Sequence, residues 1–126
     1  MLIIRPVESK EEQEKICKAC NTPFRADAMA YAAREDEKLL GVCQFTMDNE
    51  CGHVYDLCCA EGVDDFEALF IMGRQTLNFI DLCGVHRAVF HGEETRATKA
   101  VGFRRTGDAL EMDLAGFFTE PCKHEK

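Results

Sequence analysis

The sequence predicts one α/β (α+β) domain with a central mixed, mostly antiparallel sheet flanked by helices, in the order βαβββαβαβ. Three observations predict this class: a serine-capped helix directly after an apolar strand, three strand-like segments separated by turns, and a long amphipathic helix after them. The chain has 126 residues, of which 46% are hydrophobic, so it can bury a core without a metal or a disulfide. We expect the domain to span residues 1–118 and a polar C-terminal tail to span residues 119–126.

The N-terminal part of the chain predicts a strand followed by a helix. Residues 2–7 are mostly apolar and partly β-branched, which is typical of a strand. Ser9 and Glu12 have the spacing of a capping box, so a helix should begin there and continue to about Cys20. Asn21 is suited to the C-cap, and a proline two residues later prevents the helix from continuing.

Three strand-like segments then predict an antiparallel meander. Turn-like residues at 36–37 and 49–52 separate them, and these short connections favour antiparallel neighbours. The segments are Met29–Glu35, Leu39–Met47 and His53–Ala60.

A long helix follows, capped by Asp64 or Asp65 and ending before Gly84, which stands where a C′ glycine belongs. Gly73, inside this helix, is expected to permit close packing on the sheet. The apolar face consists of Phe66, Leu69, Gly73, Leu77 and Ile80. The remaining elements are a strand over Val85–His91, a short helix over Glu93–Val101 and a last strand over Ala109–Phe117.

Charge and hydropathy exclude two classes of partner. The 15 basic and 23 acidic residues give a net charge of −8, and no basic cluster is longer than the pair Arg104 and Arg105. The positive surface that grips a nucleic-acid backbone is therefore missing. The longest apolar run, Ala68–Gly73, is too short to span a bilayer, and no secretory signal is recognisable at the start. We expect a cytoplasmic protein with no nucleic-acid or membrane partner.

The eight cysteines are expected to be reduced and mostly buried. Cys17 and Cys20 have the C-x-x-C spacing of redox and zinc sites, but they stand at the C-terminal end of their helix, where the helix dipole raises a thiol pKa. A second C-x-x-C is absent, so we expect no metal site. Further thiolates and imidazoles for the alternative, a zinc site, stand at Cys51, His53, Cys122 and His124.

The order of elements resembles the GNAT superfamily of acyl-CoA-dependent N-acetyltransferases over nearly the whole chain. Residues 57–59 match the end of the fourth strand of the superfamily, and Gly84 matches the glycine that ends its long helix. Gly102 and Phe103 resemble the glycine-phenylalanine pair that closes its second motif. The resemblance implies acetyl-CoA as cofactor and a small-molecule or peptidyl amine as acceptor.

The phosphate-binding turn departs from the superfamily pattern. Active members carry R-G-x-G-x-G there, because glycines let backbone N–H groups approach the cofactor's diphosphate at a helix N-terminus. Here the matching residues are 64–69, which contain no glycine and have Asp64 at the arginine position. An aspartate N-cap also occupies the N–H groups that a phosphate would use. Acetyl-CoA binding in the usual pose is therefore expected to be weak or lost. By position alone, the cofactor would contact Cys58, Cys59, Ala60, Asp65, Phe66, Ala68 and Leu69.

Two residues are candidates for acid-base chemistry. Asp56, on the expected fourth strand, matches a position where members of the superfamily often carry a base; the alternative is an ordinary hydrogen-bonded strand residue. His91 ends the fifth expected strand, where the resembled fold admits its ligand. Glu93 and Glu94 beside it would suit a cationic amine. Thr98 replaces the tyrosine that often serves as general acid. Two functions stay open: an N-acetyltransferase with weak or atypical acetyl-CoA use, and a non-catalytic GNAT-like binding or interaction domain.

Overall fold

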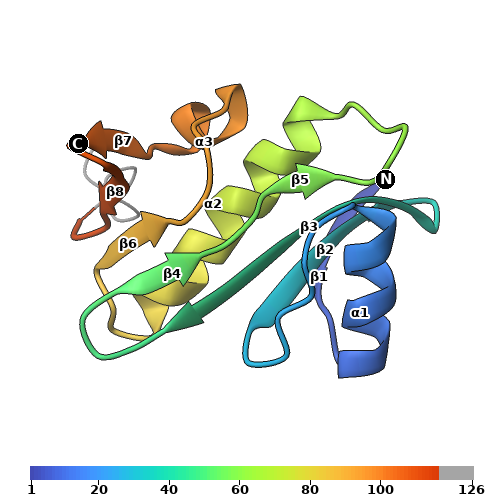
Figure 1. The fold of residues 1–126 in the computed structure, drawn as a ribbon, viewed down its shortest axis with the longest axis horizontal. Helices are drawn as coiled ribbons and strands as arrows, with labels where there is room; N and C mark the ends of the chain where they lie inside the picture. The colour runs from blue at the N-terminus through green and yellow to red at the C-terminus, as the bar shows by residue number, and fades with distance from the viewer. Residues whose placement is uncertain (117–126) are drawn as a thin grey trace, which may run out of the picture.

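Residues 1–116 are described by the structure, a computed structural model, and form one eight-stranded sheet with three helices. The elements are β1 (Leu2–Pro6), α1 (Lys10–Ala19), β2 (Met29–Glu35), β3 (Lys38–Met47), β4 (Gly52–Val54), β5 (Cys58–Cys59), α2 (Phe66–Leu82), β6 (Arg87–Phe90), α3 (Arg96–Val101), β7 (Arg104–Thr106) and β8 (Ala109–Asp113). The strands are ordered β1-β2-β3-β4-β6-β8-β7, and β5 pairs with β3 beside this path. All pairs are antiparallel except β4 with β6 (Figure 1). The predicted fold class, a mixed and mostly antiparallel sheet flanked by helices, is confirmed.

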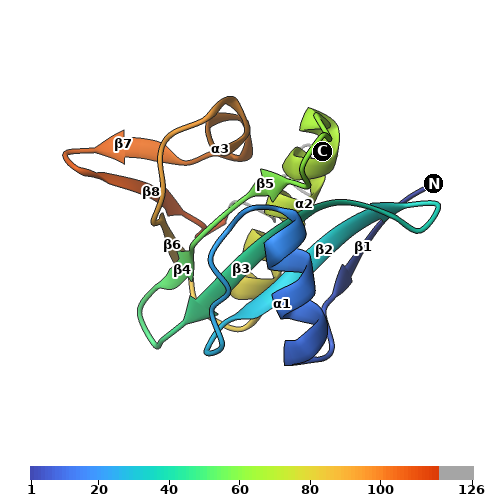
Figure 2. The same ribbon diagram turned by 45° about the vertical axis from the view of Figure 1, so that its right-hand side comes forward.

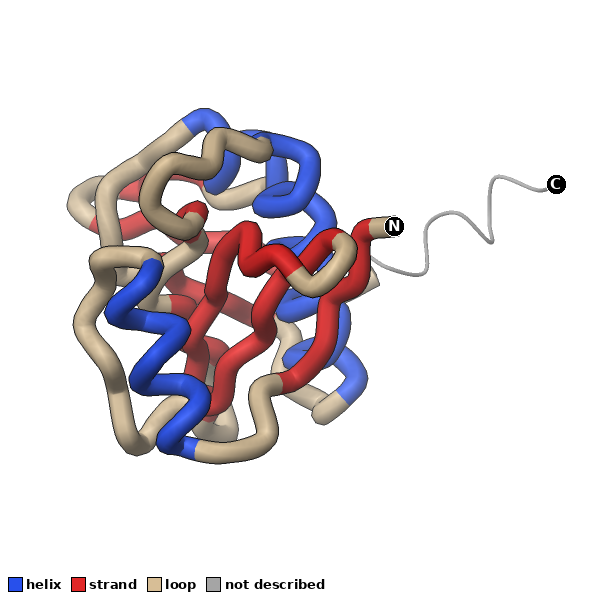
Figure 3. Tube along the Cα trace, turned by 90° about the vertical axis from the view of Figure 1, so that its right-hand side faces the viewer, coloured by secondary structure: helices blue, strands red, loops and turns tan. Residues whose placement is uncertain are grey.

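The sheet separates two apolar cores. Helix α1 lies against one face and α2 against the other (Figures 2 and 3). Because successive side chains of a strand point to opposite faces, β3 supplies Phe45 to the α2 side and Val42 to the α1 side. The α2 side holds the larger core, which includes Met72, Leu77 and Ile80.

Both long helices begin at their expected caps. The Ser9 side chain accepts the Glu12 N–H at 3.1 Å, but only this half of the predicted capping box forms, because the Glu12 carboxylate pairs instead with Arg34 of β2 at 3.5 Å. The C-cap of α1 is Cys20 rather than Asn21, and Asn21 follows it with a φ of 55°, the left-handed conformation that commonly ends a helix. Of the two aspartates considered for α2, Asp65 is the N-cap.

Gly73 permits close packing, but of a different kind from the one predicted. A Cβ atom there would lie 2.8 Å from Cγ2 of Val101 and 3.2 Å from Cδ2 of Leu57. The contacts come from α3 and from the segment between β4 and β5, so the glycine brings α2 close to those segments.

The structure corrects the expected third strand of the meander, which is interrupted at residues 55–57. The Asp56 carboxylate accepts the backbone N–H of Gln44 at 2.7 Å, in the place of a main-chain carbonyl. A side chain therefore replaces one bond of the ladder, and β4 and β5 are separate strands.

The C-terminal part differs from the prediction in three places. Helix α3 begins only at Arg96, because Thr95 and Thr98 form its capping box. β7 was not expected; it pairs with β8 across a two-residue turn in which Gly107 has a φ of +65°. The last strand ends at Asp113 because that carboxylate accepts the N–H of Ala115 at 3.0 Å. The expected tail, with Cys122 and His124, lies outside the described residues. Within residues 1–116, no helix is long and apolar enough to cross a bilayer.

Candidate functional site

The parallel strands β4 and β6 separate at His91. Their last main-chain bond runs from the His91 N–H to the Val54 carbonyl, at 2.8 Å. Beyond it, β5 continues the line of β4 while the chain after β6 turns toward α3 (Figure 1). Within residues 1–116, β5 pairs only with β3, so its second edge has no strand partner. A short stretch of main chain is therefore open beside the point of separation.

The main chains of β3 and β5 lie close together at Gly41, and this close contact fixes the position of the open edge. A Cβ atom at Gly41 of β3 would lie 2.6 Å from the carbonyl oxygen of Cys58. Of the residues expected to bind cofactor, Cys58 and Cys59 form β5, and Ala60 follows with its N–H bonded to the Leu40 carbonyl at 2.8 Å. Burial raises the pKa of the Cys58 thiol to about 12, so this thiol is not a nucleophile near neutral pH.

Asp56 lies between β4 and β5 and is 7% exposed. Its carboxylate accepts hydrogen bonds from the Gln44 N–H (2.7 Å), Gln44 Nε2 (2.7 Å) and the Thr22 hydroxyl (2.9 Å). Burial raises the pKa of the carboxyl above its usual range, although these bonds and Arg25 act in the opposite direction. The Asp56 oxygens are thus directed at the protein's own donors.

Gln44 connects Asp56 to α1 and to the loop after it. Its Nε2 also donates to the Pro23 carbonyl at 2.8 Å, and its Oε1 accepts the Arg25 N–H and Gln13 Nε2, both at 2.9 Å. Within the described chain, no buried side-chain nitrogen or oxygen lacks a hydrogen-bond partner. The orientation of the Gln44 amide is therefore fixed by four partners.

A cluster of titratable side chains surrounds His91 on the α1 side of the sheet. His91 Nε2 lies 2.8 Å from His53 Nδ1, and His53 Nε2 lies 3.2 Å from Asp48 Oδ2. The His91 ring stacks on Tyr55 with 5.2 Å between ring centres, and the Arg25 guanidinium lies 4.1 Å from the centre of the Tyr55 ring. Partial desolvation lowers the pKa of His91 below its usual 6.5, although the residue is exposed, and His53 and Arg25 lower it further. Neutral imidazole is favoured at this position.

The N-terminus of α2 is occupied by the protein itself. Asp65 Oδ1 accepts the N–H of Ala68 at 3.0 Å. Beside it, a groove of about 540 Å3 separates α2 from α3, and the Arg96 guanidinium lies 3.9 Å from the centre of the Phe66 ring. The groove is lined by Phe66, Glu94, Thr95, Arg96, Lys99 and Ala100.

The other candidate residues lie apart from the histidine cluster or are already engaged. Glu94 forms an ion pair with Arg105 at 3.6 Å, and Thr98 is buried in the capping box of α3. Burial raises the pKa of Cys17 to about 11 and that of Cys20 to about 12, as expected for core thiols. Residues 1–116 contain no group of three or more His, Cys, Asp and Glu side chains able to hold a metal ion.

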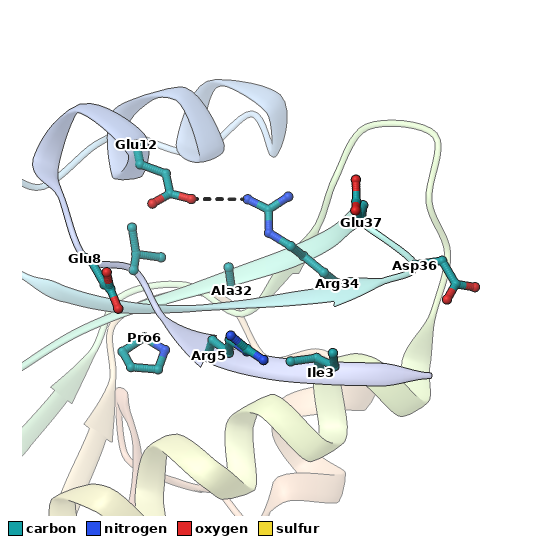
Figure 4. A pocket seen from close by; sticks show the side chains of 10 residues that line it. Ile3, Arg5, Pro6, Glu8, Glu12, Ala32, Arg34, Asp36 and Glu37 are labelled. Carbon is teal, nitrogen blue, oxygen red and sulfur yellow. Dashed lines mark ion pairs between the residues drawn. The ribbon is translucent and has the colours of Figure 1, made fainter.

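A cavity of about 390 Å3 lies between α1, β1 and β2, away from the histidine cluster. The ion pair of Glu12 and Arg34 crosses it (Figure 4). Its remaining charged residues, Arg5, Glu8, Asp36 and Glu37, include both signs.

The sequence indicated His91 but not the residues around it. Asp48 stands between the expected strand Leu39–Met47 and the expected turn at 49–52, and Arg25 stands between the expected first helix and the strand Met29–Glu35. Tyr55 lies within the expected strand His53–Ala60. Strand alternation is the sequence signal that could have linked them. Once β4 and β6 are known to be parallel, it places His53 and His91 on the same face of the sheet.

No family model matches the sequence, and no curated protein matches it. Solved structures match its fold. A GNAT family acetyltransferase from Brucella melitensis in complex with acetyl-CoA has a TM-score of 0.70 at 14% identity, over 90% of this chain and 88% of that one. Spermidine/spermine N-acetyltransferase SpeG from Vibrio cholerae has a TM-score of 0.71 at 10% identity, over 94% and 96%.

N-acetylglutamate synthase from Neisseria gonorrhoeae, complexed with coenzyme A and N-acetyl-glutamate, has a TM-score of 0.70 at 12% identity. The match covers 90% of the present chain but spans only 35% of the synthase. The chain therefore has the fold of the GNAT acyl-CoA N-acyltransferases, as the order of elements predicted.

Proposed function

We propose that this chain is an acyl-CoA-dependent N-acyltransferase that acetylates an amine. The observation that carries the proposal is the open edge of β5 at the point where β4 and β6 separate, with His91 at its base. An unpaired strand edge recognises an extended, amide-containing ligand through main-chain hydrogen bonds. The pantetheine arm of acetyl-CoA is such a ligand, and Cys58 and Cys59 would hold it.

In this proposal His91 is the base and Asp56 has a structural role. Bound acetyl-CoA supplies an activated acetyl group as a thioester. His91, neutral near pH 7, accepts a proton from the acceptor amine, which leaves the nitrogen lone pair free to attack the acetyl carbonyl carbon. A main-chain N–H of β5 would polarise the acetyl carbonyl oxygen. The C–N bond forms as the C–S bond of the thioester breaks, and the second proton of the nitrogen goes to the departing CoA thiolate, so the products are the amide and CoA–SH. The Asp56 carboxylate does not act as the base, because its oxygens already accept three hydrogen bonds from the protein.

The groove between α2 and α3 is the proposed binding site for the phosphates of the cofactor. The N-terminus of α2 does not fit a diphosphate, because Asp65 already accepts the Ala68 N–H and Asp64 adds a second negative charge. Arg96 and Lys99 line the groove from α3 and offer two cations within it, and Glu94, which also lines it, is paired with Arg105 at 3.6 Å. We therefore assign the phosphates to the α3 side.

Calorimetric titration with acetyl-CoA tests the binding half of the proposal. We expect a Kd in the micromolar range, about −8 kcal/mol, and about tenfold weaker binding by the Arg96→Ala/Lys99→Ala variant. Arg104→Ala, which removes an exposed cation on β7, should bind like the native chain. Equal binding by all three proteins would remove α3 from the phosphate site.

A second candidate function is a non-catalytic GNAT-fold binding domain, and the observation that favours it is the capped N-terminus of α2. Two variants distinguish the two ways in which the aspartates could prevent phosphate binding, by their negative charge or by occupying the Ala68 N–H. Asp64→Asn/Asp65→Asn removes two negative charges and keeps a good N-cap, whereas Asp65→Gly frees the Ala68 N–H. No heat from the native chain, with binding restored in either variant, would favour the second function.

Transfer itself is measured with a panel of amines that begins with glutamate and spermidine, the compounds in the names of two structural neighbours. The chain has eight cysteines, so CoA release is followed by chromatography rather than by a thiol reagent. We expect His91→Gln to lower turnover about 100-fold or more, the usual contribution of a general base. Native turnover in His91→Gln would remove that residue from the mechanism.

A further inference from the structure

Three side chains from separate segments form a continuous hydrogen-bonded chain that ends at His91. Asp48 stands in the turn after β3, His53 on β4 and His91 directly after β6. Pairing of β4 with β6 matches His53 with Val89, so His91, two residues further, lies on the same face as His53. The bonded distances are 3.2 Å from Asp48 Oδ2 to His53 Nε2 and 2.8 Å from His53 Nδ1 to His91 Nε2.

The hydrogen bonds around Asp48 set the direction of this chain. Asp48 Oδ1 accepts the N–H groups of Glu50 at 2.8 Å and Cys51 at 2.9 Å. The bond from Glu50, together with those from His53 and Cys51, lowers the pKa of the Asp48 carboxyl, which keeps it ionised. An ionised carboxylate only accepts, so His53 Nε2 must carry the proton that points at it.

The tautomer of His91 then follows by elimination. A neutral His53 with its proton on Nε2 has a bare Nδ1, which must accept a hydrogen bond from His91 Nε2. A neutral His91 with its proton on Nε2 has its lone pair on Nδ1. The hydrogen bonds of residues 1–116 give that Nδ1 atom no protein donor. One proton-accepting position is left at the His91 end of the chain.

The surroundings hold the His91 ring in place. Tyr55 stacks on it, and the Tyr55 hydroxyl is in turn bonded to Thr46 at 2.9 Å. Of the groups facing His91, His53 from β4 and Arg25 from the loop after α1 bear on its charge, and the Asp48 carboxylate lies beyond His53. Asp48 and His53 are 61% and 27% exposed at their side chains, so the far end of the chain reaches water.

We propose that Asp48 and His53 are positioning residues that fix the tautomer of His91 and carry the proton of the acceptor amine to solvent. This inference rests on the proposed N-acyltransferase function. The ammonium gives one proton to His91 Nδ1, and His91 passes its Nε2 proton to His53 Nδ1. His53 then holds a positive charge beside the Asp48 carboxylate and releases a proton to water. The proton that His53 releases is the one on Nε2, so each imidazole returns to its starting charge with its tautomer reversed, and the amine nitrogen keeps the electron pair that attacks the acetyl group. The starting tautomers return once the amide product has left: His91 Nδ1 loses its proton to water, His53 Nδ1 passes its proton to His91 Nε2, and His53 Nε2 takes up a proton from water beside Asp48.

Asp48→Asn is the sharpest test, because it keeps the turn but reverses the donor and acceptor in each hydrogen bond between Asp48, His53 and His91. Its side-chain oxygen can still accept the two N–H groups of the turn, while its NH2 group donates to His53 Nε2. His53 must then carry its proton on Nδ1, and His91 must carry its proton on Nδ1 as well, so the lone pair is lost where it is needed. We expect nitrogen NMR of the full chain to find the Nε2–H tautomer of His91 in the native protein and the Nδ1–H tautomer in Asp48→Asn.

Kinetics supply the second readout. In Asp48→Asn and His53→Ala we expect kcat for acetyl transfer to fall at least about tenfold, with the KM for acetyl-CoA unchanged and the acid limb of the pH profile shifted. Asp81→Asn replaces a carboxylate by an amide beside His86, in a pair of the same kind elsewhere on the surface, and should leave both readouts native.

The two proposals fail differently. A native His91 in the Nδ1–H tautomer, or an Asp48→Asn variant with native tautomer and native kcat, overturns the relay while acetyl transfer stands. Absence of transfer from the native chain, with the Nε2–H tautomer present, overturns the proposed function and with it the proton-carrying role.

Discussion

A buried carboxylate without a cation in contact needs hydrogen-bond donors, and Asp56 has three of them. Two come from Gln44, whose amide orientation is fixed because its oxygen already accepts from Arg25 and Gln13. The network joins β3, the loop after α1 and the break between β4 and β5. Asp56 therefore holds the segment that leads to the open edge of β5.

Asp56→Asn tests this role. In the native chain the three donors bond to two carboxylate oxygens, but the asparagine has only one oxygen. Its NH2 group then faces either the Gln44 N–H or Gln44 Nε2, and each of these is itself a donor. We expect a loss of about 1–3 kcal/mol in the free energy of unfolding, the cost of an unsatisfied buried polar group. Urea denaturation measures it. Asp108→Asn, at an exposed turn, should change stability by less than about 0.5 kcal/mol, and equal stability of the two variants would contradict the structural role.

At the scale of elements, local signals in the sequence predicted most of the fold. Ser9 and Asp65 mark helix starts through bonds to residues three positions away, and such bonds can be read from spacing. The break between β4 and β5 could not be predicted, because it depends on Asp56 meeting Gln44 twelve residues away. The turn that joins β7 to β8 does carry a local hairpin signal, Gly107 followed by Asp108, so β7 was predictable from the sequence.

Packing of α2 against α3 makes a prediction at Gly73. Alanine is favoured over glycine in a helix by about 1 kcal/mol, but its Cβ would lie 2.8 Å from Val101, which is fully buried. Overpacking costs about 1–3 kcal/mol, so we expect Gly73→Ala to lower stability by about 1 kcal/mol net. In a Val101→Ala background the same change should be neutral or stabilising. A double-mutant cycle by urea denaturation measures the coupling, and additive effects would show that the contact is unimportant.

At the scale of the whole molecule, the histidine cluster is a product of topology. His91 could be predicted because it ends a strand in a resembled fold. Asp48 and His53 could not be linked to it, because parallel pairing brings together residues 38 positions apart. Arg25 reaches Tyr55 from a third segment, the loop after α1. The sequence thus indicated one member of the cluster, and only the fold defines the rest.

The same cluster makes the stability of the whole chain depend on pH. Because the pKa of folded His91 lies below 6.5, the unfolded chain takes up a proton first as the pH falls, which favours unfolding. Stability should therefore decrease from about pH 7.5 to about pH 5.5. The lowered pKa of Asp48 acts at and below pH 4, outside this window. The raised pKa of Asp56 has the opposite sign, because the folded chain takes up that proton first as the pH falls, so Asp56 offsets part of the loss.

Urea unfolding at both pH values measures this change. His91→Gln should lose less stability than the native chain on acidification, whereas Arg104→Ala, at an exposed position of β7 away from the cluster, should keep the native dependence. If His91→Gln keeps the native dependence as well, His91 is protonated equally in the folded and unfolded chains. A histidine of that kind would be partly charged in the folded protein near pH 6.5 and unsuited to accept the amine proton there.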